Sequence, residues 1–137
     1  MLVNLNIRLS SVEENMNRVE EFVSNIMASF GIDVYHHGKI YVAVEEAVSN
    51  AIRYGNKNNP NKYVTVEFNL CNSYFDFSVA DEGEGFDCNI VSNPISSDNE
   101  DESRGMFLMQ TLSDELIFKD SGSKVVMRFY NNVKSIA

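Results

Sequence analysis

Glu45-Glu46-Ala47-Val48-Ser49-Asn50-Ala51 is the first of three short stretches that decide the fold predicted for this chain. The second is Asp81-Glu82-Gly83-Glu84-Gly85-Phe86, and the third is Ser103-Arg104-Gly105-Met106-Phe107. The first indicates a helix with an acid and an amide on one face, because Glu46 and Asn50 are four residues apart. The second indicates an acidic strand end that runs into a glycine loop, and the third a basic entry into another helix. In this order, the three stretches predict a nucleotide pocket.

Hydrophobic periodicity around these stretches predicts strands and helices in a fixed order. The predicted elements are a strand at 3–9, a helix from Ser10 or Ser11 to 30, a helix at 33–55, a hairpin of strands at 64–70 and 75–79, an irregular segment at 87–103, a helix at 105–113, and strands at 115–119 and 124–130. Helices on one face of a mixed, mostly antiparallel sheet form an α+β two-layer sandwich. We expect one domain that covers residues 1–137, because the chain has the length of a single domain.

The composition is that of an ordinary globular protein, with 44% hydrophobic and 23% charged residues. The formal net charge of −9 argues against direct nucleic-acid binding, which needs a basic face. An acidic surface serves solubility in most proteins, and it also suits a basic protein partner. No apolar run approaches the roughly 20 residues that span a bilayer, and no signal peptide is evident, so we expect a cytoplasmic protein without membrane contact. Cys71 and Cys88 show neither metal nor disulfide spacing, which predicts reduced thiols.

The pair formed by Glu46 and Asn50 has the chemistry of a metal- and proton-handling site. A carboxamide oxygen such as that of Asn50 is a hard, neutral ligand for Mg²⁺, which takes the rest of its shell from water and substrate phosphates. The Glu46 carboxylate can accept a proton from an attacking hydroxyl group or orient that group. Ala43, Ala47 and Ala51 keep the surroundings small. The alternative is a solvated pair on an exposed helix face.

The second and third stretches supply groups for a base and for phosphates. Asp81 at a strand end can accept a hydrogen bond from an exocyclic amine such as that of adenine, and Gly83 and Gly85 let the backbone pass close to a flat base. A helix start at Gly105, with bare amides and the guanidinium of Arg104, suits an anion. The alternatives are a plain acidic glycine turn and a helix start with an exposed arginine.

Together the three stretches resemble the N box and the two glycine boxes of the GHKL (Bergerat-fold) ATPases. Residues 45–56 (EEAVSNAIRYGN) are similar to the N box, 79–86 (VADEGEGF) to the first glycine box and 104–115 (RGMFLMQTLSDE) to the second. The likeness is to the small bacterial anti-sigma factor serine/threonine kinases, and length and element order agree over nearly the whole chain. Ser103 and Ser123 depart from the pattern, because they stand where many relatives carry a glycine and a threonine.

The resemblance implies a histidine-kinase-like ATPase fold that binds ATP and Mg²⁺. The implied roles are the catalytic base for Glu46, the Mg²⁺ ligand for Asn50, the adenine contact for Asp81, the base pocket for Gly83 and Gly85, the phosphate end for Arg104, Gly105 and Met106, and an ATP lid for 87–103. Members of this group bind a sigma factor and hold it inactive, and they phosphorylate a serine of an anti-anti-sigma factor. The resemblance therefore implies these two partners, and it also implies a homodimer.

Two other functions compete with the kinase. One is a nonenzymatic partner-switching module on the same fold, which binds nucleotide weakly or not at all; the presence of Glu46, Asn50, Asp81 and Arg104 favours the kinase over it. The other is the catalytic domain of a larger histidine kinase. It is disfavoured because only 35 residues precede His36 and no dimerising phosphoacceptor helix pair is evident.

Overall fold

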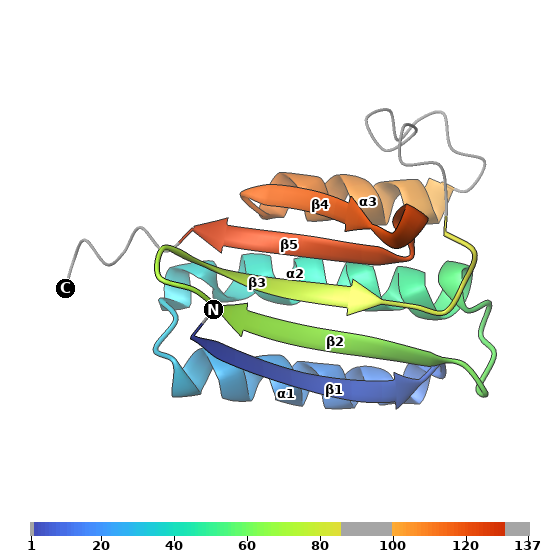
Figure 1. Ribbon diagram of the computed structural model, residues 1–137, viewed down its shortest axis with the longest axis horizontal. Helices are drawn as coiled ribbons and strands as arrows, with labels where there is room; N and C mark the ends of the chain where they lie inside the picture. Colours follow the sequence, from blue (N-terminus) through green and yellow to red (C-terminus); the bar gives the residue numbers. More distant parts are fainter. Residues whose placement is uncertain (1, 86–99, 131–137) are drawn as a thin grey trace.

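The computed structural model describes residues 2–85 and 100–130 of the chain. Its elements are, in order, β1 (Val3–Ser10), η1 (Glu13–Asn15), α1 (Met16–Ser29), α2 (Val34–Asn50), η2 (Ala51–Gly55), β2 (Tyr63–Leu70), β3 (Tyr74–Ala80), α3 (Glu100–Leu112), β4 (Glu115–Lys119), η5 (Asp120–Gly122) and β5 (Lys124–Tyr130). The strands form one sheet in the order β1-β2-β3-β5-β4, and each neighbouring pair is antiparallel. The three α-helices lie on one face of this sheet (Figure 1), which confirms the predicted α+β two-layer sandwich. None of the described helices is long and apolar enough to cross a membrane.

Alternating side chains give the sheet one buried and one open face. Val64, Val66 and Phe68 of β2 are fully buried, whereas the residues between them are only partly buried. Phe68 lies opposite Phe77 of β3, and their ring centroids are 5.1 Å apart. Burial of each such side chain contributes roughly 1.5–3 kcal/mol to stability. This apolar layer fixes the sheet against the helices that carry the first and third stretches.

Helix α1 begins at Met16, later than the predicted cap at Ser10 or Ser11, and the short turn η1 precedes it. The reason is that Ser11 is fully buried and its hydroxyl donates to the carbonyl oxygen of Lys62 at 2.8 Å, so it does not cap the helix. The predicted end is confirmed. Gly31 has a φ of 62°, and the amide of the next residue donates back to the Met27 carbonyl at 3.0 Å.

Helix α2 carries the first stretch and continues into one π-helical turn. Asp33 caps its start by accepting a hydrogen bond from the Tyr35 amide at 2.9 Å. After Asn50 the helix widens into η2, and the Asn56 amide closes the wider turn by donating to the Ala51 carbonyl at 2.8 Å. Single π-helical turns occur frequently at functional sites, because they redirect the residues that follow.

Helix α3 begins at Glu100, so the predicted start at Gly105 is wrong. Glu100, Asp101 and Glu102 form its first turn, where the positive end of the helix dipole favours acidic side chains. Residues 100–103 of the predicted irregular segment are therefore helical, and 87–99 lie outside the described residues. Arg104 and Gly105 lie within the helix and not at its N-terminal amides.

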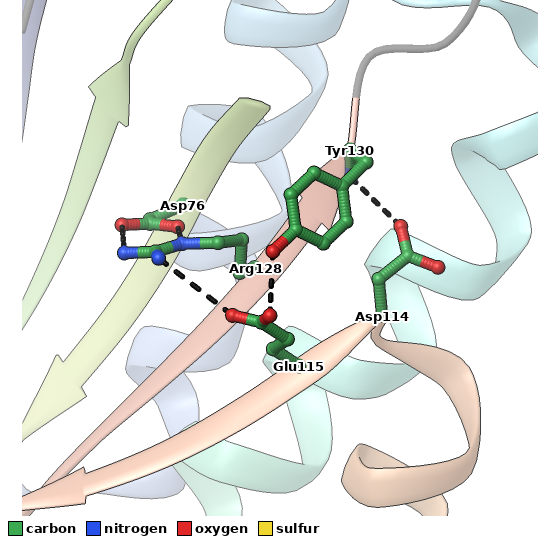
Figure 2. Close-up of polar contacts among 5 residues, drawn as sticks. All are labelled: Asp76, Asp114, Glu115, Arg128 and Tyr130. Atoms are coloured by element: carbon green, nitrogen blue, oxygen red, sulfur yellow. Dashed lines mark hydrogen bonds and ion pairs between the residues drawn. The ribbon is translucent and has the colours of Figure 1, made fainter. Parts of the chain in front are cut away.

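Charged side chains form a network on the open face of the sheet (Figure 2). Arg128 of β5 lies opposite Asp76 of β3 and donates to its two carboxylate oxygens at 2.8 and 3.1 Å. The guanidinium carbon of Arg128 is also 3.9 Å from the centroid of the Tyr74 ring. Glu115 accepts a hydrogen bond from the Tyr130 hydroxyl and lies 3.7 Å from Arg128. These contacts keep Asp76 only 7% exposed on a face that no described helix covers.

Candidate functional site

A cavity of about 210 Å³ lies where the three stretches meet. Five of the predicted site residues line it: Asn50 from α2, Asp81, Gly83 and Gly85 from the loop after β3, and Met106 from α3. These residues are far apart in the sequence, and only the antiparallel sheet with its helices on one side brings them together. The cavity is smaller than the roughly 300–1,000 Å³ of typical ligand pockets.

Glu46 and Gly105 meet beside Asn50, at the contact between α2 and α3. A Cβ atom at Gly105 would lie 2.8 Å from Glu46 Oε1 and 3.0 Å from Asn50 Nδ2, closer than ordinary contact allows. Glycine at this position therefore lets α3 pack directly against the acid and the amide. Glu46 and Gly105 themselves are not among the residues that line the cavity. Asn50 Nδ2 also donates a long hydrogen bond of 3.4 Å to the Glu102 carbonyl oxygen. The predicted acid–amide pair thus lies at a helix–helix contact and not on a solvated face.

Arg104 does not reach the cavity. Its side chain is 62% exposed and forms an ion pair of 2.6 Å with Asp101, one turn earlier on the outer side of α3. The prediction of Arg104 and Gly105 at a helix N-terminus is wrong, because the acidic turn before them is already helical. The adjacent Ser103 is 5% exposed, and its hydroxyl has no hydrogen-bond partner among the described residues.

Asp81 is held tightly between the end of η2 and its own glycine loop. The Gly83 amide donates to Asp81 Oδ1 at 2.8 Å, and the Asp81 amide donates to the Ser123 carbonyl at 2.9 Å. A Cβ atom at Gly55 would lie 2.3 Å from Asp81 Oδ2, and one at Gly83 would lie 2.2 Å from the Gly55 carbonyl oxygen. Glycine at both positions lets the backbone approach the carboxylate and fixes its direction.

Glu102 is a second carboxylate at this cavity, from the first turn of α3. Burial raises the pKa of Asp81, although the Gly83 hydrogen bond and the charge of Lys62 act in the opposite direction. Burial also raises the pKa of Glu102, and the negative charge of Asp81 raises it further. The cavity therefore concentrates negative charge, which a bound cation or a donor group can offset.

The sequence from residue 9 to residue 129 matches the model of the histidine kinase-like ATPase domain. This range covers most of the chain and includes all of the predicted site residues. The chain belongs to the histidine kinase-like ATPase domain family. The predicted fold and the resemblance to this family are confirmed.

Named relatives of this ATPase domain include serine-protein kinases. The chain is 27% identical over 123 residues to the serine-protein kinase RsbW of Listeria innocua, which covers 83% of this chain and 78% of that protein. It is 24% identical over 136 residues to RsbW of Staphylococcus aureus, which covers 92% and 86%. The structure is similar to that of the RsbU and RsbW domains of Rv1364c from Mycobacterium tuberculosis, with a TM-score of 0.59 and 16% identity over 93% of this chain. The chain spans 32% of the Rv1364c chain, and this likeness supports the fold alone.

Two lysines that no sequence pattern predicts line the cavity of this ATPase domain. Lys57 and Lys62 lie at the two ends of the loop between η2 and β2, and both contribute to the wall. The sequence of this loop, NKNNPNK at residues 56–62, is rich in Asn and has the composition of a turn, which by itself does not indicate a ligand site. The residue that could have indicated a ligand site here is Lys57, a cation that closely follows the helix carrying the first stretch. In this acidic chain, the two ammonium groups are the cations that line the described cavity.

Proposed function

We propose that this chain is an ATP-dependent protein serine kinase that binds a sigma factor and phosphorylates an anti-anti-sigma partner. The observation that carries the proposal is the convergence of Asn50, Asp81, Gly83 and Gly85 on one cavity of a histidine kinase-like ATPase domain, with Glu46 next to Asn50 at the contact with α3. The relatives named serine-protein kinase support a serine substrate rather than a histidine. Under this proposal the chain is cytoplasmic and its partners are proteins. Protein partners, rather than nucleic acid, agree with the net charge of −9.

The end of the cavity at Asp81 fits an adenine base. The carboxylate of Asp81 is directed by the Gly83 amide and is flanked by the bare backbone at Gly55. A carboxylate at this point accepts a hydrogen bond from the adenine amine, and the close approach of Gly55 and Gly83 keeps the carboxylate in its direction. Half-burial of Asp81 strengthens such a hydrogen bond, because water competes for it less.

The end of the cavity at Asn50 fits a magnesium–phosphate group. Gly105 lets α3 pack directly against Asn50 and Glu46, beside the end of the cavity that Asn50 lines. The Asn50 carboxamide oxygen is suited to hold Mg²⁺, which when bound neutralises charge on the phosphates. Glu46, one helical turn away, is placed to accept the proton of a serine hydroxyl. Lys57 and Lys62 offer further donors to the nucleotide.

Two substitutions separate the proposed roles. Glu46→Gln keeps the shape but removes the base, so phosphate transfer should fall by about 10²–10⁴-fold with ATP affinity within about twofold of the wild type. Asp81→Asn should weaken ATP binding by roughly tenfold, because the negative charge that strengthens the hydrogen bond from the adenine amine is lost. Calorimetry with Mg-ATP and transfer of labelled phosphate to a purified anti-anti-sigma protein measure the two effects.

The control for Glu46 is its neighbour on α2. Glu45 is partly buried near Glu20 of α1, and Glu45→Gln removes the same charge without touching the cavity. It should leave transfer and binding unchanged. Equal loss of ATP binding in the Glu46 and Asp81 variants would contradict the separate roles. Wild-type binding of ATP without transfer would favour the partner-switching module, and no binding at millimolar ATP would exclude the kinase.

A further inference from the structure

Asn56 is a polar side chain buried at the junction of three segments, outside the residues assigned to the reaction. Its side chain is 1% exposed. Asn56 Nδ2 donates to Ser11 Oγ at 2.7 Å and to the Tyr63 carbonyl oxygen at 3.0 Å, and Asn56 Oδ1 accepts from the Glu82 amide at 2.7 Å. One side chain thus joins the end of β1, the start of β2 and the loop after β3.

These three hydrogen bonds specify a carboxamide. The Tyr63 carbonyl can only accept and the Glu82 amide can only donate, so the side chain between them must offer a donor and an acceptor. The Ser11 hydroxyl already donates to the Lys62 carbonyl, and it is therefore the acceptor from Asn56. Aspartate lacks the donor, and leucine, which is of similar shape, lacks both groups.

A second set of contacts joins the start of β2 to the loop after β3. The Glu82 carboxylate accepts from the Tyr63 amide at 2.5 Å, so the start of β2 and the glycine loop are joined through both Asn56 and Glu82. Next to this link, Gly55 packs against the Asp81 carboxylate and against Gly83. The loop that carries Asp81 is thereby fixed to the end of η2 on one side and to β2 on the other.

We infer that Asn56 is a positioning residue for nucleobase recognition: with Glu82, it fixes the loop that directs the Asp81 carboxylate into the cavity. The inference rests on the proposed function, because it assigns to the Asp81 end of the cavity the base of the bound nucleotide. Adenine presents an amine where guanine presents a carbonyl oxygen. A carboxylate held in one place binds the first and rejects the second, and a mobile carboxylate discriminates less.

The test is the preference for ATP over GTP, measured by competition binding on the full chain with Mg²⁺. The preference is the Kd for GTP divided by the Kd for ATP. Asn56→Ala and Glu82→Ala should each reduce this ratio about tenfold, the factor that corresponds to one hydrogen bond of a charged group. Glu82→Gln should retain the wild-type ratio, because its amide oxygen still accepts from the Tyr63 amide. Glu82 is exposed, so its variants fold even if Asn56→Ala does not.

Two controls separate positioning from general destabilisation. Glu21→Ala removes an exposed acid from α1, and Val23→Ala weakens the buried core of the same helix. Both should keep the wild-type ratio, although the second lowers the melting temperature. An unchanged ratio in Asn56→Ala and Glu82→Ala, with ATP bound by the wild type, would overturn this inference alone. No ATP binding by the wild type would overturn the proposed function and this inference with it.

Discussion

At the scale of single residues, Glu102 and Asp81 place two half-buried carboxylates at one cavity. Folding raises the pKa of both groups above their usual values of 4.5 and 3.8, mainly through burial. The folded chain therefore binds protons more tightly than the unfolded chain does. The contribution of these two groups to stability is therefore largest below their usual pKa values, and it is lost as the pH rises through their raised pKa values in the folded chain. The site thus carries an electrostatic cost at neutral pH that a bound cation can relieve.

Glu102→Gln should raise the melting temperature at pH 7, and the gain should shrink as the pH falls toward 4. The expected gain in unfolding free energy is less than about 1 kcal/mol, because the group is about half exposed to screening solvent. Glu100→Gln is the control, since this exposed acid in the same turn interacts favourably with the helix dipole and its loss should be slightly destabilising. Equal destabilisation by both changes at pH 7 would contradict the assigned cost.

At the scale of elements, α2 and α3 each contain one interior glycine, and the two have different surroundings. Gly38 in α2 has no atom within 4 Å of a Cβ placed on it, whereas Gly105 in α3 faces Glu46 and Asn50. An interior glycine costs a helix about 1 kcal/mol relative to alanine. At Gly105 the glycine lets α3 pack directly against the acid–amide pair, and at Gly38 no described contact accounts for the glycine.

Gly38→Ala should therefore stabilise the fold by about 1 kcal/mol without changing ATP affinity. Gly105→Ala should leave the fold intact, because the Glu46 and Asn50 side chains that the new methyl group meets are flexible and can move aside. It should weaken binding by displacing Glu46 and Asn50, at a melting temperature near that of the wild type. Thermal unfolding and calorimetry on the two variants measure both effects. Unchanged ATP affinity in Gly105→Ala would show that the positions of Glu46 and Asn50 beside this glycine do not affect binding.

At the scale of the whole molecule, the ion pair of Asp76 with Arg128 joins β3 to β5 in the interior of the sheet (Figure 2). The Asp76 carboxylate is almost fully buried although it lies on the open face. Arg128→Met should lower the unfolding free energy by about 2 kcal/mol or more, because it leaves a buried carboxylate without its partner. Arg104→Met breaks the exposed pair with Asp101 and should cost less than about 1 kcal/mol.

Urea denaturation measures this difference as a shift of the transition midpoint at constant slope. The contrast tests whether the open face is held by its own ion pair. Equal, small effects of the two arginine changes would mean that the pair contributes no more than an exposed one.

The sequence alone determined the order of elements and the two-layer architecture, and it predicted five of the residues that line the cavity. The strands from Val64 to Leu70 and from Phe75 to Val79 follow from alternation, because a sheet covered on one face buries every second side chain. Asn50, Asp81 and the glycines of the second stretch could be predicted because few residue types suit the metal, the amine and the flat base that we propose for this cavity. These requirements are local, so they leave a readable pattern.

The tertiary structure alone decided the start of α3, the direction of Arg104 and the positions of Asn56, Lys57 and Lys62. The acidic run from Asp98 to Glu102 has the polarity of a loop, yet the dipole and the packing of Met106 and Met109 make 100–103 part of a helix. Asn56 has the composition of a turn, but its burial depends on Ser11, Tyr63 and Glu82, which lie 45, 7 and 26 residues away. A residue's partners across such distances are set by how the sheet and helices pack, and no local pattern encodes them.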